Sequence, residues 1–155
     1  MTELMTELNL PIKPLSDIAH VPGNAYKGDA GYDLCSTVDL VLEPFERTLI
    51  PTGLALQIPD GYAGFVLPRS GMAIKTGLSL VNAPGLIDSN YRGEIQAIAI
   101  NLDPKNPIEI HVGDRIAQLV IMKVENVHFE VVDELSSSSR GEGGFGSSGL
   151  SSTNR

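Results

Sequence analysis

Short apolar runs separated by turn residues make up the middle of the chain. They cover residues 38–42, 47–50, 52–59, 61–68, 77–82, 94–101, 108–111, 114–125 and 128–132. Gly, Pro, Asn and Asp interrupt these runs roughly every 8–12 residues, a spacing typical of an all-β sandwich or barrel. The run at 94–101 is almost continuously apolar, which predicts a strand buried on both faces.

One segment has a helical pattern. Ser70 is followed by good helix formers as far as Lys75, which predicts a helix of about one and a half turns with Ser70 as its cap. Gly77 is expected to end this helix. The Gly- and Asp-rich residues 26–32 predict a loop. Because helices do not alternate with strands, the pattern disfavours a doubly wound α/β fold.

The two ends of the chain differ from its middle. The tetrapeptide MTEL occurs twice within residues 1–8, and we interpret 1–10 as a flexible N-terminal extension. We expect residues 11–135 to form a single β domain, a sandwich or a barrel. Residues 136–155 contain eight Ser and five Gly, a composition typical of a flexible segment that cannot pack a core.

Composition limits the classes of function. The 155 residues are 42% hydrophobic and 19% charged, as expected for one globular domain. A net charge of −8 argues against non-specific binding to nucleic acid and against adhesion to anionic membranes. The N-terminus lacks the pattern of a signal peptide, and no apolar run is long enough to span a bilayer, so we expect a cytoplasmic protein.

Cysteine and histidine offer little chemistry. Cys35 is the single cysteine, so no disulfide forms within the chain, and its apolar neighbour predicts a small buried side chain. The three histidines are far apart in sequence, and no zinc-binding spacing occurs. We therefore expect surface or hydrogen-bonded strand histidines. The sequence also lacks a P-loop and a nucleophile elbow.

Two segments next to predicted strands could bind a ligand. In residues 68–71, a guanidinium, a hydroxyl and the N–H groups of a helix start indicate an anion site. The alternative is an ordinary capped helix, which is more common. Residues 82–93 form a long hairpin tip that holds Asp88, Tyr91 and Arg92 close together. Such loops often have functional roles, although a solvated polar loop would look the same.

Two further segments have weaker signals. Gln118 is predicted on the same face of its strand as Ile116, so it needs a hydrogen-bond partner. Asp114 and Arg115 predict a turn and a surface ion pair. Residues 140–149 set one Arg and one Phe in a glycine-rich backbone, which suits a flap that orders over a ligand. The alternative is a disordered linker.

The order of these segments is more specific than any one of them. DAGYDL, PRSG, GLIDSNYRGEI, GDRIAQL and RGEGGFGSSG occur in that order between residues 29 and 149. They resemble the five ordered motifs of the trimeric dUTPase family, with bacterial features. The resemblance implies a jelly-roll-like β barrel with one short helix, a homotrimer with three intersubunit sites, and Mg²⁺-dependent hydrolysis of dUTP to dUMP and pyrophosphate. That reaction keeps uracil out of DNA and supplies dUMP for dTMP synthesis.

The resemblance also implies roles on the nucleoside side of the site. Asp88 corresponds to the aspartate that orients and deprotonates the attacking water. Tyr91 corresponds to the tyrosine under the deoxyribose, where it leaves no room for a 2′-hydroxyl. The hairpin that reads uracil corresponds to Asn82, Leu86, Ile87 and Gln96.

On the phosphate side, the resemblance implies a cradle formed by Arg69, Ser70, Gly71 and Gln118. Asp33 would be an outer contact of Mg²⁺ through water, and Arg115 a structural partner of Asp33 or Asp114. In the flap that residues 136–155 would form over the site, Arg140 corresponds to an arginine finger on the γ-phosphate and Phe145 to the ring stacked on uracil. Its remaining contacts with the substrate would come from Gly146, Ser147 and Ser148.

Two alternatives remain at this point. A dCTP deaminase-like enzyme would have a similar fold, but it uses a glutamate on the cytosine ring, whereas Asp88 followed by Tyr91 favours hydrolysis. A non-catalytic nucleotide-sensing trimer would be free to lose Asp88, Arg140 and Phe145, and all three are present.

Overall fold

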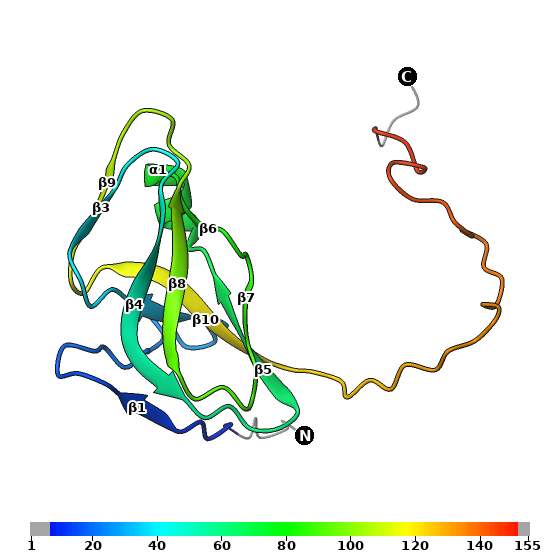
Figure 1. Ribbon diagram of the computed structural model, residues 1–155, viewed down its shortest axis with the longest axis horizontal. Coiled ribbons are helices and arrows are strands. Elements are labelled where there is room, and N and C mark those ends of the chain that lie inside the picture. Colours follow the sequence, from blue (N-terminus) through cyan, green and yellow to red (C-terminus); the bar gives the residue numbers. More distant parts are fainter. Residues whose placement is uncertain (1–6, 152–155) are drawn as a thin grey trace.

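The computed structural model describes residues 7–151, which form an all-β fold with one short helix (Figure 1). The strands and the helix, in chain order, are β1 (Ile12–Pro14), β2 (Tyr32–Cys35), β3 (Leu40–Leu42), β4 (Arg47–Leu56), β5 (Tyr62–Leu67), α1 (Ser70–Thr76), β6 (Leu78–Leu80), β7 (Gly85–Ile87), β8 (Glu94–Asn101), β9 (Ile108–Ile110) and β10 (Arg115–Lys123). The predicted fold class is confirmed.

The strands form two four-stranded antiparallel sheets and one two-stranded sheet. Their orders are β1-β4-β8-β6, β2-β10-β5-β7 and β3-β9. Buried apolar side chains from both larger sheets form one core cluster, including Ile50 and Ala97 from the first sheet and Leu34 and Leu119 from the second. The fold is therefore a sandwich of the jelly-roll type, closed over a single core.

Helix α1 ends as predicted but begins differently. Gly77 adopts a left-handed conformation (φ 78°), and its N–H donates to the carbonyl of Ala73. The residue at the N-cap is Arg69, which makes no side-chain capping bond, and Ser70 is the first helical residue. The prediction that Ser70 caps the helix is therefore wrong. The junction leaves both side chains free of a capping role.

Strand β8 is buried on one face only. Ile95, Ala97 and Ala99 are buried, whereas Gln96 is exposed and Ile98 is half-buried. The prediction of a strand buried on both faces is wrong for this chain, because only one side of the β4-β8-β6 layer packs on the core. The opposite face of β8 lines a pocket described below.

The predicted strand at 128–132 is also wrong. These residues pair with no strand in the described part of the chain, and Phe129 and Val131 are 86% and 98% exposed. Figure 1 shows the chain leaving the barrel after β10 and running away from it. An alternating pattern produces a strand only where the edge of another strand lies beside it. Within residues 7–151, no strand edge pairs with this segment.

Cys35 is buried in β2, as predicted. Burial raises the pKa of its thiol above the ordinary value, and the charge of nearby Arg115 partly opposes this rise. Both interpreted terminal segments extend beyond the described chain, since residues 1–6 and 152–155 lie outside it. Between residues 7 and 151, none of the helical structure is long and apolar enough to cross a membrane.

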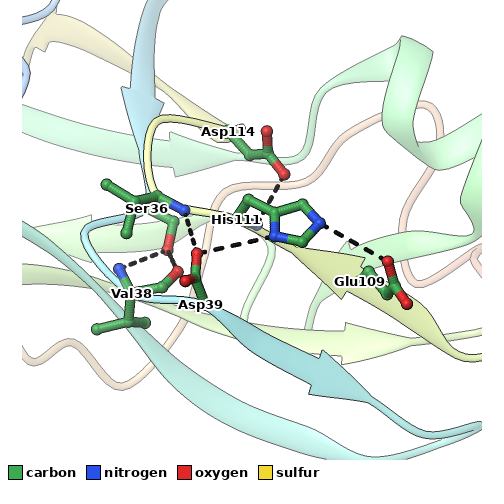
Figure 2. Close-up of polar contacts among 7 residues, drawn as sticks. Ser36, Val38, Asp39, Glu109, His111 and Asp114 are labelled. Atoms are coloured by element: carbon green, nitrogen blue, oxygen red, sulfur yellow. Dashed lines mark hydrogen bonds and ion pairs between the residues drawn. The ribbon is translucent and has the colours of Figure 1, made fainter.

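A polar cluster fixes the turn between β9 and β10 (Figure 2). The backbone N–H of His111 donates to the Asp114 carboxylate at 2.8 Å, and that of Val112 donates to Asp39 at 2.8 Å. The exposed imidazole of His111 lies 3.8 Å from Asp39 and 3.7 Å from Glu109. His111 is thus a surface histidine, as predicted, and the cluster sets where β10 begins.

Candidate active site

A first pocket, of about 270 Å³, lies over β7, β8 and the loop that connects these two strands. The structure gathers in its lining the barrel residues predicted to hold the nucleoside: Asn82, Leu86, Ile87, Asp88, Tyr91 and Gln96. These residues come from both larger sheets, because β7 pairs with β5 in one sheet and β8 pairs with β4 and β6 in the other. We call this cavity the nucleoside pocket.

Asp88 directly follows β7 and is exposed. The N–H of Tyr91 donates to the Asp88 carbonyl at 3.1 Å, which closes the turn between them. Within residues 7–151 the Asp88 carboxylate has no hydrogen-bond or ion-pair partner, so both of its oxygens are available to water. A carboxylate in this state can act as a general base.

Arg92 and Glu94 fix the hairpin tip and were given no role from the sequence. One Nη of Arg92 donates to the carbonyls of Ser89, at 2.6 Å, and Tyr91, at 3.1 Å. The Tyr91 hydroxyl donates to the carbonyl of Glu94 at 3.0 Å. All three acceptors are backbone carbonyls, so the residue types in the sequence do not indicate these hydrogen bonds. Only the residues RGE, directly after Tyr91, pointed to this part of the loop.

A second pocket, of about 390 Å³, gathers the residues predicted to hold phosphates. Its lining includes Asp33, Arg69, Ser70, Gly71 and Gln118, together with part of the loop before β2. We call it the phosphate pocket. It shares no lining residue with the nucleoside pocket, so the chain presents two separate pockets.

Asp33 holds two arginines at the phosphate pocket. Its Oδ1 accepts a hydrogen bond from Arg69 Nε at 2.8 Å, and its Oδ2 lies 3.5 Å from Arg115 Nε. Of the two partners proposed for Arg115, Asp33 is the one observed, while Asp114 accepts from the turn backbone. Because Asp33 binds Arg69 through Nε, the terminal nitrogens of that guanidinium remain available to an anion.

Gln118 has the hydrogen-bond partner that its half-buried position requires. Its Nε2 donates to the carbonyl of Pro68 at 2.9 Å. The prediction that Gln118 shares a strand face with Ile116 is wrong. The register of β10 against β2 shifts between Arg115 and Ala117, and Ile116 and Ala117 are both buried. Gln118 Oε1 packs against Gly31, where a Cβ would collide with it.

The glycine-rich tail lies apart from both pockets. Arg140, Phe145, Gly146, Ser147 and Ser148 line neither of them. Arg140 Nε donates to the carbonyl of Gly143 at 2.6 Å, and Phe145 is fully exposed. Figure 1 shows this segment well away from the barrel. The structure therefore brings together the barrel residues predicted for the site and leaves the tail residues outside it.

The described residues contain no group of three or more His, Cys, Asp or Glu side chains that could hold a metal ion.

Comparison with known proteins places this arrangement in a family. The family model described as dUTPase matches residues 17–149. The deoxyuridine 5′-triphosphate nucleotidohydrolase of Rhodococcus erythropolis is 53% identical over 142 residues, which is 92% of this chain and 87% of that protein. The enzyme of the same name from Nocardia farcinica is 54% identical over 140 residues, 90% of this chain and 85% of the relative.

Two solved structures have the same fold. A variant dUTPase of Staphylococcus bacteriophage 80alpha with dUpNHpp is 36% identical, has a TM-score of 0.85, and covers 92% of this chain and 99% of its own. A mutant dUTPase from phage phi11 of S. aureus, described for its coordination of a structural Mg(II) ion, is 31% identical with a TM-score of 0.76, over 82% of this chain and 98% of its own. From the ordered motifs, the two pockets and these similarities, we conclude that this chain belongs to the dUTPase family.

Proposed function

We propose that this chain hydrolyses dUTP to dUMP and pyrophosphate in the cytoplasm. The observation that supports this most directly is the division of the site. One pocket combines an unpaired carboxylate with an aromatic ring, and the other combines a guanidinium with a hydroxyl and an amide. The first composition suits a nucleoside and an attacking water, and the second suits a triphosphate. Both are built on strands or at strand ends, which keeps them rigid.

Asp88 acts as the general base. Its free carboxylate accepts a hydrogen bond from a water molecule and takes the proton as that water attacks the α-phosphorus in line with the departing pyrophosphate. Tyr91 lies under the deoxyribose and excludes a 2′-hydroxyl. Asn82 and the backbone of β7 and β8 pair with the uracil edge, since a site built to hydrogen-bond its substrate discriminates strongly.

The phosphate pocket and the tail complete the site. Arg69, oriented by Asp33, binds phosphate oxygens together with Ser70, the Gly71 backbone and Gln118. Residues 136–155 close over the bound nucleotide, with Arg140 on the γ-phosphate and Phe145 on the uracil ring. A closing flap excludes water and strengthens the charge interactions inside the site.

Mg²⁺ is the proposed cofactor. Magnesium retains waters and is often held by substrate phosphates with few protein carboxylates, which fits a chain with no dedicated ligand cluster in its described part. Both oxygens of Asp33 face arginines, so Asp33 suits an outer contact through water. Bound Mg²⁺ would neutralise part of the triphosphate charge, which a chain of net charge −8 otherwise repels.

Hydrolysis in water labelled with heavy oxygen tests the proposed reaction. Attack on the α-phosphorus places the label in dUMP and none in pyrophosphate. The same reaction in excess chelator is expected to stall. Label in pyrophosphate would contradict the proposed role of Asp88, and equal turnover without Mg²⁺ would contradict the proposed cofactor.

Gly31→Ala is expected to lower kcat/KM for dUTP about 10- to 100-fold, as for loss of one hydrogen bond to a charged group. The added methyl displaces the Gln118 side chain from the phosphate pocket, while the flexible amide moves without disturbing the core. Steady-state kinetics and thermal melting measure the two effects. In a chain that already has Gln118→Ala, Gly31→Ala should add nothing. An equal further loss there would contradict this explanation.

We also propose that the chain assembles as a homotrimer whose three sites lie between subunits. Two half-sites with no shared lining fit a site completed by a neighbour. In addition, residues 125–135 expose apolar side chains, including Val127, Phe129 and Val131, with no partner strand among the described residues. An apolar groove of about 490 Å³, lined in part by Val21 and Ile121, offers room for such a segment from another copy.

Light scattering tests the trimer, with an expected mass of about three times 16.5 kDa. Phe129→Ser is expected to shift the mass towards the monomer. Refolding a mixture of Asp88→Asn and Arg69→Ala chains should restore part of the activity, because some mixed sites would contain two intact halves. A monomeric wild-type chain with full activity would contradict the proposal.

A further inference from the structure

Gly93 lies where the ring of Tyr91 rests against the backbone. A Cβ built on Gly93 would fall 2.6 Å from Tyr91 Cζ and 3.0 Å from Cε2, and it would also collide with the hydroxyl oxygen. Such distances are too short for carbon atoms in contact. The backbone of Gly93 is not in the left-handed region, so the requirement for glycine here is steric and not conformational.

The hydroxyl end of the same ring is also held by Glu94, the residue after Gly93. The Tyr91 hydroxyl donates to the carbonyl of Glu94 at 3.0 Å. The Glu94 carboxylate in turn accepts the N–H of Gly53 at 2.9 Å, within the irregular stretch of β4 between Pro51 and Ala55. The position of the ring is therefore set by backbone atoms that are tied to a central strand of the barrel.

We infer that Gly93 is a positioning residue that determines the choice between deoxyribose and ribose. This inference rests on the proposed function, in which the Tyr91 ring lies under the sugar. Steric exclusion of a single hydroxyl depends on ring placement to within a fraction of an ångström. Because Gly93 has no Cβ, the Tyr91 ring can pack against the backbone just before β8. The hydrogen bond from the Tyr91 hydroxyl to the Glu94 carbonyl holds the ring in this position.

Gly93→Ala is expected to lower the ratio of kcat/KM for dUTP to that for UTP about tenfold or more. Ring displacement away from the pocket makes room for the 2′-hydroxyl and raises turnover of UTP. The expected movement is therefore away from the pocket. Displacement into the pocket would crowd deoxyribose and ribose alike and leave the ratio undiminished, which would contradict the inference. Gly23→Ala is the matched control, because a Cβ added to Gly23 would meet no atom within 4 Å and this glycine has no positive φ.

A second background separates displacement of the ring from general damage to the hairpin. Tyr91→Phe removes the hydroxyl, the part of the ring that a Cβ at Gly93 would meet first. In that background, Gly93→Ala should reduce the ratio by a clearly smaller factor, since the overlap is partly relieved. Kinetics with both nucleotides, alongside thermal melting, measure the four chains of the cycle.

The outcomes are distinct. An unchanged ratio in Gly93→Ala, or an equal fall with and without Tyr91→Phe, overturns the inference while the proposed reaction stands. Absence of dUTP hydrolysis by the unmodified chain overturns the proposed function, and the inference with it. A fall in the ratio that the Tyr91→Phe background reduces supports the role of Gly93.

Discussion

Replacing Asp88 with asparagine is expected to lower kcat for dUTP by about 10²–10⁴-fold, the usual contribution of a general base. Asparagine keeps the size of the side chain and one acceptor oxygen but cannot take the proton of the attacking water. KM should change little, because the carboxylate is proposed to act on water and not to bind the nucleotide. Steady-state kinetics of the purified variant with Mg²⁺ measure both constants.

Asp17→Asn is a suitable control for this substitution. Asp17 is exposed and lies outside both pockets. Its replacement by Asn removes one negative charge, as Asp88→Asn does. The activity of Asp17→Asn and the melting temperatures of both variants should equal those of the wild type, since the exposed Asp88 carboxylate makes no hydrogen bond or ion pair within residues 7–151. An Asp88→Asn chain that keeps more than about a tenth of wild-type kcat would contradict the role given to this carboxylate.

Ending the chain at Leu135 is expected to lower kcat/KM for dUTP by about 10³-fold or more, the range for loss of an arginine finger. The deletion removes Arg140 and Phe145 together. Melting temperature should remain nearly unchanged, because no residue between 136 and 151 belongs to the hydrophobic core. Kinetics and thermal melting of the shortened protein test both statements.

Single substitutions in the full-length chain assign this loss to particular groups. Arg140→Ala should account for most of the fall in kcat, and Phe145→Ala should mainly raise KM. If the shortened chain were as active as the whole one, residues 136–155 would be a linker and not a flap. A large fall in melting temperature would instead show that the tail stabilises the barrel.

The fold was predictable from the sequence where a strand is long and its buried side chains lie mainly on one face. The interval predicted for β8 agrees with Glu94–Asn101, and β10 differs from its predicted interval by only one or two residues at its ends. Strands β1, β2 and β7 were missed, because they have only three or four residues each and no apolar run marks them. Residues 128–132 were mistaken for a strand of this chain, because alternation does not say whether a partner edge exists.

The sequence motifs predicted which residues belong to the site but not the contacts between them. Their order identifies the residues that gather in the nucleoside and phosphate pockets, but it does not say which side chains meet. Asp33 and Arg69 are 36 residues apart, and their hydrogen bond depends on the sheet that brings β2 near the end of β5. The steric roles of Gly31 and Gly93 depend on the absence of an atom, which local sequence cannot reveal.

Release of pyrophosphate from dUTP, dTTP, dCTP and UTP, measured side by side with Mg²⁺ and with a parallel assay for ammonia, tests the proposed function most directly. We expect rapid release from dUTP, little from the other three nucleotides, and no ammonia. Ammonia from dCTP would identify a deaminase of similar fold. Turnover of none of the four would contradict the proposed hydrolysis and favour a protein that binds nucleotides without acting on them.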